Sequence, residues 1–154
     1  MTGSLRARIA GHPFFSGFPG DMLDLLVEGA SEVTFERREL IFREHDSADF
    51  FYLIVKGKVA IEIFAPDRGP MTIQTADDGD IVGWSWLVEP YEWHFDAQAI
   101  EITEVIAFDA ARLRELAAAR PDLGYALFSR FMPVLVERLQ ATRMQLLDWY
   151  HVNG

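Results

Sequence analysis

The 154-residue sequence contains no cysteine, so disulfides, thiolate zinc ligands and cysteine nucleophiles are all excluded. It also lacks any run of about 18 apolar residues, which is the length that a membrane-spanning helix needs. The N-terminal segment 1–15 carries two arginines but no apolar stretch of signal-peptide length. These absences predict a cytoplasmic protein without a membrane anchor.

Basic side chains are scarce as well. The chain has 14 Lys and Arg against 24 Asp and Glu, giving a formal charge of -10 and a pI near 4.7. Such a surface repels DNA phosphates and anionic lipids. We therefore expect neither a direct nucleic-acid partner nor a membrane partner.

The usual signatures of enzymes and metal sites are missing too. There is no G-x-S-x-G, P-loop, G-x-G-x-x-G, H-E-x-x-H or H-x-H motif. His94 and Asp96 are the one pair of potential metal ligands on a strand face, and single-histidine haem ligation is a further alternative. Asp78 and Asp80 are better explained as turn formers. The sequence thus predicts a non-enzymatic protein with no metal or other cofactor.

Half of the residues are hydrophobic, enough to fill the core of one domain over residues 1–154. Helical spacing of apolar residues predicts a short helix within an N-terminal part, 12–30. From 31 to 108, short β-branched and aromatic runs are separated by turn residues about every ten positions, and residues 93–99 alternate apolar with polar. This pattern predicts a β-barrel of the sandwich or jelly-roll kind.

Residues 109–150 are predicted to form C-terminal helices. Asp109 suits an N-cap, Pro121 suits the first turn of a second helix, and Pro133 should kink or restart that helix. The second helix carries a heptad seam of Phe128, Met132, Leu135, Leu139, Thr142, Leu146 and Trp149. A helix of roughly 28 residues spans about 40 Å, more than one small barrel covers. We expect a homodimer through this helix; the alternative is a helix lying wholly on its own barrel.

Three segments carry a resemblance to a known family. HPFFSGFPGDMLDLL (12–26) is similar to its opening helix, ELIFREHDSADFFYLIVKGKVAIEI (39–63) to its hairpins, and DDGDIVGW (77–84) to the entry of its phosphate cassette. Over about residues 12–150 the chain resembles the cyclic-nucleotide-binding domain of the catabolite-activator-like regulators. The resemblance implies a mainly β fold with α, a β-roll with a short N-terminal helix and a long C-terminal dimerisation helix. Those regulators continue into a DNA-binding helix-turn-helix, whereas this sequence stops at Gly154, so a stand-alone domain is expected.

The resemblance also implies where a ligand would bind. In the family, a glutamate after the cassette glycine holds the ribose, and an arginine followed by serine or threonine holds the phosphate. Here Trp84 follows Gly83, and ungapped counting places Trp93 at the arginine position and His94 after it; a one-residue slip places His94 there instead. The stretch 69–111 holds nine acidic residues and no Lys or Arg. The cassette is therefore divergent, and charge-assisted binding of cyclic AMP or cyclic GMP is not expected.

Three of the four tryptophans fall within residues 84–95. They predict either a pocket for a flat, neutral or cationic effector or a barrel interior filled by its own rings. The candidate pocket residues are Gly79, Val82, Gly83, Trp84, Ser85, Trp86, Trp93, His94 and Asp96. The corresponding functions are a sensor that signals through its dimer helix to a protein partner, or an interaction scaffold without a ligand. A true cyclic-nucleotide sensor is the third alternative.

Overall fold

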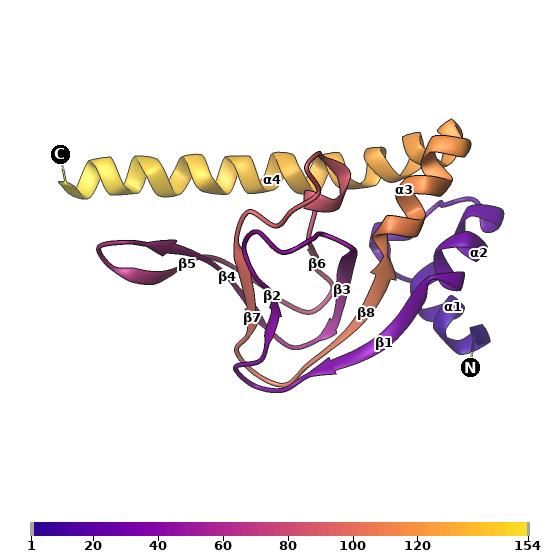
Figure 1. Cartoon of the computed structure of the whole chain (residues 1–154), viewed down its shortest axis with the longest axis horizontal. Coiled ribbons are helices and arrows are strands. Elements are labelled where there is room, and N and C mark those ends of the chain that lie inside the picture. The colour runs from indigo at the N-terminus through magenta and orange to yellow at the C-terminus, as the bar shows by residue number, and fades with distance from the viewer. Residues whose placement is uncertain (1, 154) are drawn as a thin grey trace.

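The computed structural model describes the backbone of residues 2–153 and the side chains of residues 5–148 (Figure 1). Its antiparallel strands form two four-stranded sheets, with the orders β1-β8-β3-β6 and β2-β7-β4-β5. The strands are β1 (Ala30–Phe35), β2 (Leu40–Phe42), β3 (Phe50–Lys56), β4 (Val59–Ala65), β5 (Gly69–Ala76), β6 (Ile81–Val82), β7 (Asp96–Ala99) and β8 (Thr103–Asp109). The predicted β-roll with flanking helices is confirmed.

Buried and more exposed residues alternate from residue 93 to the end of β7. Trp93, Phe95, Ala97 and Ala99 are buried, while the residues between them are exposed or half-buried. This is the pattern that the sequence predicted for one buried and one polar face. The apolar run continues past residue 99, but the chain turns there, and β8 pairs with β1 and β3 in the other sheet.

The N-terminal helices are α1 (Thr2–Ala10), the short 3-10 helix η1 (Pro13–Phe15) and α2 (Gly20–Glu28). Helix α2 buries Met22, Leu23 and Leu26, as its spacing indicated. Helix α1 was not expected, because its sequence has few apolar residues and no helical period. Its Ile9 is fully buried in the core, so tertiary packing stabilises a helix whose local signal is weak.

The C-terminal helices are α3 (Ala110–Ala119) and α4 (Pro121–Asn153), and a second 3-10 helix, η2 (Ser85–Leu87), precedes β7. The Asp109 carboxylate accepts a hydrogen bond from the Arg112 backbone N–H, which confirms the predicted N-cap. Pro133 lies inside α4, which continues through it without restarting. Helix α4 passes over the barrel, and its C-terminal half extends beside the β4–β5 hairpin (Figure 1). None of the described helices is long and apolar enough to cross a membrane.

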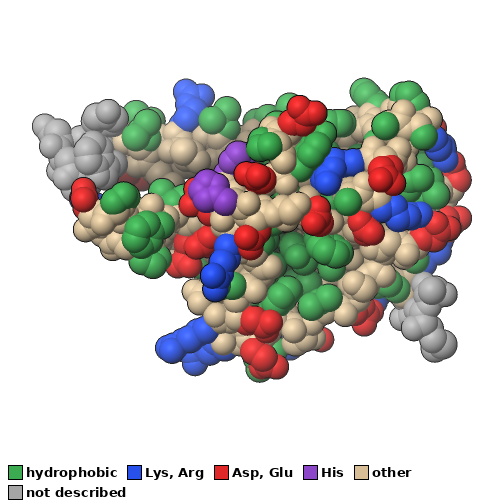
Figure 2. Space-filling view, in the orientation of Figure 1, with side chains coloured by type: hydrophobic (Ala, Val, Ile, Leu, Met, Phe, Trp, Pro, Cys, Tyr) green, Lys and Arg blue, Asp and Glu red, His purple; other side chains and the backbone are tan. Residues whose placement is uncertain are grey.

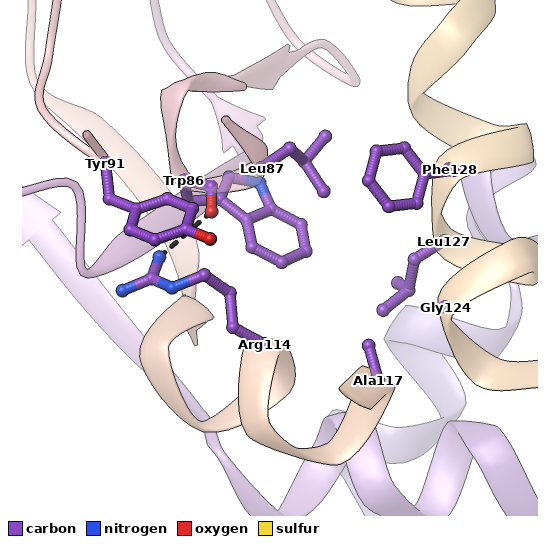
Figure 3. Close-up of a pocket in the computed structure, with 8 residues that line it drawn as sticks. All are labelled: Trp86, Leu87, Tyr91, Arg114, Ala117, Gly124, Leu127 and Phe128. Carbon is purple, nitrogen blue, oxygen red and sulfur yellow. Dashed lines mark hydrogen bonds between the residues drawn. The ribbon is translucent and has the colours of Figure 1, made fainter. Parts of the chain in front are cut away.

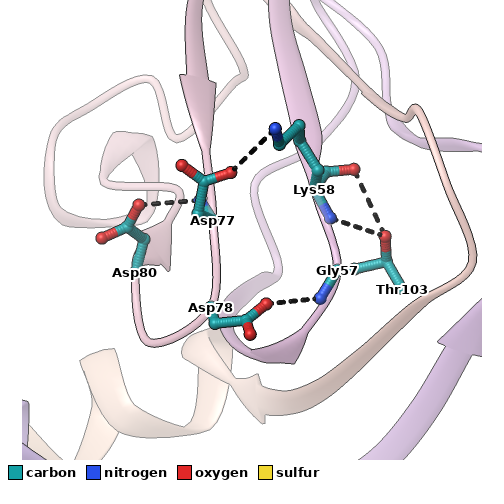
Figure 4. A network of polar contacts seen from close by, with 6 residues as sticks. All are labelled: Gly57, Lys58, Asp77, Asp78, Asp80 and Thr103. Carbon is teal, nitrogen blue, oxygen red and sulfur yellow. Dashed lines mark hydrogen bonds and ion pairs between the residues drawn. The ribbon is translucent and has the colours of Figure 1, made fainter.

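The acidic turn at residues 77–80 joins the two sheets (Figure 4). Asp78 accepts a hydrogen bond of 2.7 Å from the Gly57 N–H, in the turn between β3 and β4. Asp80 accepts one of 2.8 Å from the Asp77 N–H. Thr103 lies against the same turn and bonds to both backbone groups of Lys58 at 3.3 Å. These carboxylates therefore stabilise turns, as the sequence indicated.

Gly57 cannot carry a side chain in this network. Its φ is +136°, and a Cβ atom there would lie 2.5 Å from Thr103 Oγ1 and 2.7 Å from Thr103 Cα. We expect Gly57→Ala to lower the free energy of unfolding by about 3 kcal/mol or more, because overlap with backbone adds to left-handed strain. Gly69→Ala is the matched control, since Gly69 has a φ of +77° but open space around it.

Gly69→Ala should lower the free energy of unfolding by only about 1 kcal/mol, which is the cost of the backbone conformation alone. Urea denaturation followed by tryptophan fluorescence measures both losses. Equal losses at the two glycines would contradict the assigned close contact with Thr103.

Candidate functional site

A cavity of about 330 Å³ lies between the second sheet and α4. We call it the barrel–helix cavity. It is lined by Ile61, Ile73, Gln74, Trp84 and Phe95 from the barrel, and by Leu135, Arg138, Leu139 and Thr142 from α4. Its volume falls at the lower end of the range, about 300–1,000 Å³, that is typical of small-molecule sites. The lining is mostly apolar, with a few polar groups.

Trp84 is the member of the predicted aromatic cluster that lines this cavity together with Phe95. Its ring centroid lies 5.8 Å from that of His94 and 6.0 Å from that of Phe95. The indole Nε1 is buried and has no acceptor among the described residues. A buried N–H without a partner costs free energy, and Trp84 carries this cost in the folded chain.

Trp93 lies in the barrel interior instead. It is 3 % exposed and stacks on Phe42, with ring centroids 3.7 Å apart and an interplanar angle of 8°. On its other side it meets Gly83, where a Cβ atom would lie 2.6 Å from the ring. Gly83 has a φ of +99°, so both its conformation and this contact require glycine. Trp93 thus fills space inside the barrel and does not line the barrel–helix cavity.

Trp86 and Ser85 also lie in the core. Trp86 stacks on Phe51 at 5.1 Å between ring centroids, and Ser85 is fully buried. Trp86 borders a smaller pocket of about 170 Å³ between η2, α3 and α4 (Figure 3). There Arg114 donates hydrogen bonds to the Ala48 and Trp86 carbonyls and packs on the Tyr91 ring. Because these contacts occupy Arg114, we assign it a structural role.

The remaining predicted residues lie apart from the cavity. His94 is exposed, and Asp96 accepts a hydrogen bond of 2.7 Å from the Glu44 N–H. Val82 is buried in the core, and Gly79 forms a turn beside His12. Burial lowers the pKa of His12, whose Nδ1 accepts a hydrogen bond from the Phe14 N–H. Within side chains 5–148, no group of three His, Asp or Glu residues is placed to hold a metal ion.

Arg138 is the site residue that the sequence reasoning missed. It projects from α4 into the wall of the barrel–helix cavity, and its Nη2 donates a hydrogen bond of 3.1 Å to the Ile81 carbonyl. The cassette stretch 69–111 contains no Lys or Arg, whereas Arg138 lies far beyond it in the chain. A signal was available, since Leu127, Phe131 and Val134 precede Arg138 at spacings of 4, 3 and 4, which place it on the barrel-facing side of the helix.

The exposed side of α4 carries a second apolar face. We call it the outer stripe; its residues are Tyr125, Phe128, Met132, Val136, Leu139 and Leu146. All six are exposed, so most of the predicted heptad seam faces solvent. Leu135 and Thr142 of that seam turn towards the barrel–helix cavity, and the Trp149 side chain lies outside the described residues. On the face shown in Figure 2, acidic side chains are spread over the barrel, and hydrophobic ones are visible along α4.

The sequence profile of the family described as "Cyclic nucleotide-binding domain" matches residues 32–120, more than half of the chain. This chain belongs to the cyclic nucleotide-binding domain family. A "CRP-like cAMP-activated global transcriptional regulator" from Mycobacterium tuberculosis is 28 % identical over 134 residues, 87 % of this chain and 58 % of the relative. The cyclic nucleotide-binding domain described here therefore spans somewhat more than half of that regulator.

Solved structures show the same fold. A "Putative Cyclic nucleotide-binding protein" from Geobacter metallireducens has a TM-score of 0.79 and 26 % identity, covering 87 % of this chain and 97 % of that one. A "cyclic nucleotide-binding domain" from Methylobacillus flagellatus has a TM-score of 0.77 and 20 % identity, covering 96 % and 83 %. The family model and the solved structures thus agree on the cyclic nucleotide-binding fold of this chain.

Proposed function

We propose that this chain is a dimeric regulatory domain that binds a small effector other than cyclic AMP or cyclic GMP and signals through α4 to a protein partner. The position of Leu139 carries the proposal. Leu139 lines the barrel–helix cavity and also belongs to the outer stripe, where it is 60 % exposed. Any effector that shifts Leu139 therefore acts on the surface through which α4 meets its partner.

A second copy of the chain fits the outer stripe best. From Tyr125 to Leu146 the stripe covers about 32 Å of helix. A twofold axis lets each stripe bury the other, and an exposed apolar face of this length marks an interaction surface. The net charge of -10 opposes self-association elsewhere on the molecule, whereas the stripe is apolar apart from Arg143, which lies on the same face between Leu139 and Leu146.

Two features of the cassette argue against a cyclic nucleotide. By ungapped counting Trp93 takes the position of the phosphate-binding arginine, and it is packed into the core; a one-residue slip places the exposed His94 there, which is no arginine either. Trp84 stands at the position of the ribose-binding glutamate, and its indole only donates hydrogen bonds. The groups that usually recognise the phosphate and the ribose are therefore both absent from the described cassette.

Cyclic AMP and cyclic GMP are expected not to bind in the micromolar range. Loss of one charge-assisted contact to a buried phosphate costs on the order of 2–5 kcal/mol, or roughly 30-fold to several-thousand-fold in affinity. Calorimetric titration of each nucleotide tests this, with the cAMP-activated relative as positive control. Saturable micromolar binding of either nucleotide would contradict this prediction and support a true cyclic-nucleotide sensor.

Native mass spectrometry of the freshly purified protein tests the proposed function as a whole. We expect a dimer that retains a small molecule, or a dimer to which one adds during screening. One observation supports a second candidate, an interaction scaffold without a ligand: Trp93 fills the barrel interior between Gly83 and Phe42. A dimer that never takes up a small molecule would favour that scaffold.

A further inference from the structure

The barrel–helix cavity has one charged residue in its lining, and that residue is a cation. Of its nine lining residues, only Arg138 is ionisable; no Asp or Glu is among them. A cationic ligand would therefore meet a like charge in this lining, with Asp80 and Glu137 outside it but near Arg138. The charge of this lining favours an anionic ligand, whereas the aromatic cluster in the sequence suggested a neutral or cationic one.

The Arg138 guanidinium has hydrogen-bonding capacity to spare. It carries five N–H donors, of which the structure shows one engaged, by the Ile81 carbonyl. Asp80 and Glu137 are its acidic neighbours, but neither forms an ion pair with it among side chains 5–148. Asp80, Ile81 and Glu137 line a second pocket of about 160 Å³, which shares Gln74 and Arg138 with the barrel–helix cavity. An incompletely paired guanidinium in a cavity wall favours an anionic guest.

Other groups in the lining complement such a guest. Gln74 and Thr142 add an amide and a hydroxyl to the lining. Ile61, Phe95 and the remaining side chains form apolar walls. The cavity thus combines donors for an acidic group with flat apolar surface for the rest of the molecule.

We propose that the barrel–helix cavity binds a small organic acid, a carboxylate carried on a flat apolar body, and that Arg138 pairs with the carboxylate. This inference rests on the effector site of the proposed function and names the chemical class of the effector. A carboxylate matches the planar fork of one guanidinium, whereas a dianionic phosphate needs more positive charge than this wall supplies. Burial lowers the pKa of Arg138, and the Asp80 and Glu137 carboxylates act in the opposite direction.

A charge-matched pair of probes tests the proposal on the whole protein. We would titrate 2-naphthoate and its uncharged analogue 2-naphthamide, following tryptophan fluorescence and heat. The acid is expected to bind at least about 10-fold more tightly than the amide, because one retained ion pair contributes 1.4 kcal/mol or more. Arg138→Gln should abolish this preference, while Arg143→Gln, an exposed arginine on the same helix, should leave it unchanged.

Arg138→Lys is a second variant, for the case that Arg138→Gln fails to fold. It keeps the positive charge and should keep a weaker preference for the acid over the amide. Equal binding of acid and amide, failure of both to bind, or a preference that persists in Arg138→Gln would overturn the assignment of an organic acid. None of these results removes the proposed function, which fails separately if native mass spectrometry finds a dimer without any effector. A retained effector that is neutral or cationic would contradict the assignment of an organic acid, while it would agree with the proposed function.

Discussion

Replacing Trp93 with alanine is expected to lower the free energy of unfolding by about 3–5 kcal/mol, the usual cost of removing a large buried aromatic ring. The ring is 3 % exposed, stacks on Phe42 and closes over Gly83. Urea denaturation followed by circular dichroism measures the loss without relying on the deleted fluorophore.

The adjacent residue is the matched control. His94 is exposed, so His94→Ala should change the free energy of unfolding by less than about 0.5 kcal/mol. If both positions belonged to an open ligand pocket, Trp93→Ala would cost little stability. A small loss at Trp93 would therefore contradict its placement in the core and revive it as a ligand contact.

Met132→Glu is expected to convert the dimer into monomers. Met132 lies in the middle of the outer stripe, and a symmetric dimer would bury two unpaired carboxylates close to its twofold axis. Leaving a charge buried without a partner costs on the order of 2–5 kcal/mol, which weakens dimerisation by roughly 30-fold to several-thousand-fold. Unlike Leu139, Met132 does not line the barrel–helix cavity, so effector binding is not altered directly.

Met144→Glu provides the control on the same helix. Met144 is 59 % exposed but lies about 120° around the helix axis from Met132. The control should remain dimeric in sedimentation velocity at tens of micromolar, where Met132→Glu sediments as a monomer. An unmodified protein that is monomeric at this concentration, or two variants that dissociate equally, would reject the outer stripe as the dimer surface.

The sequence predicted the fold well because its signals are local. The alternation through residues 93–99, the Asp109 cap and the turn residues each act over a few positions. Helix α1 escaped prediction because the burial of Ile9 depends on contacts with distant residues. Packing with remote parts of the chain overrides weak local propensity in this case.

The site was predicted less completely for the same reason. Trp84 and Trp93 have similar local sequences, yet one lines the cavity and the other fills the barrel, and only the closed barrel decides between them. Arg138 enters from a helix that the cassette does not include. The heptad seam also drifted, because a straight helix turns every 3.6 residues rather than 3.5, so Leu135 rotates towards the cavity.

Helix α4 contacts β5, and this contact affects how exposed an edge of the second sheet is. This strand is the outermost of its sheet, and unpaired edges of that kind recruit strands from other molecules. The register of the β4–β5 pair shifts between Ile61 and Glu62, so Ile73 of β5 has no partner residue on β4. The Gln145 side-chain amide of α4 donates a hydrogen bond of 2.6 Å to the Ile73 carbonyl. A bulge and a helix side chain together interrupt the β5 edge, and Phe64 of the neighbouring β4 is exposed. The same helix that carries the outer stripe thus occupies one backbone group of this edge, and we expect the edge to recruit other strands less readily.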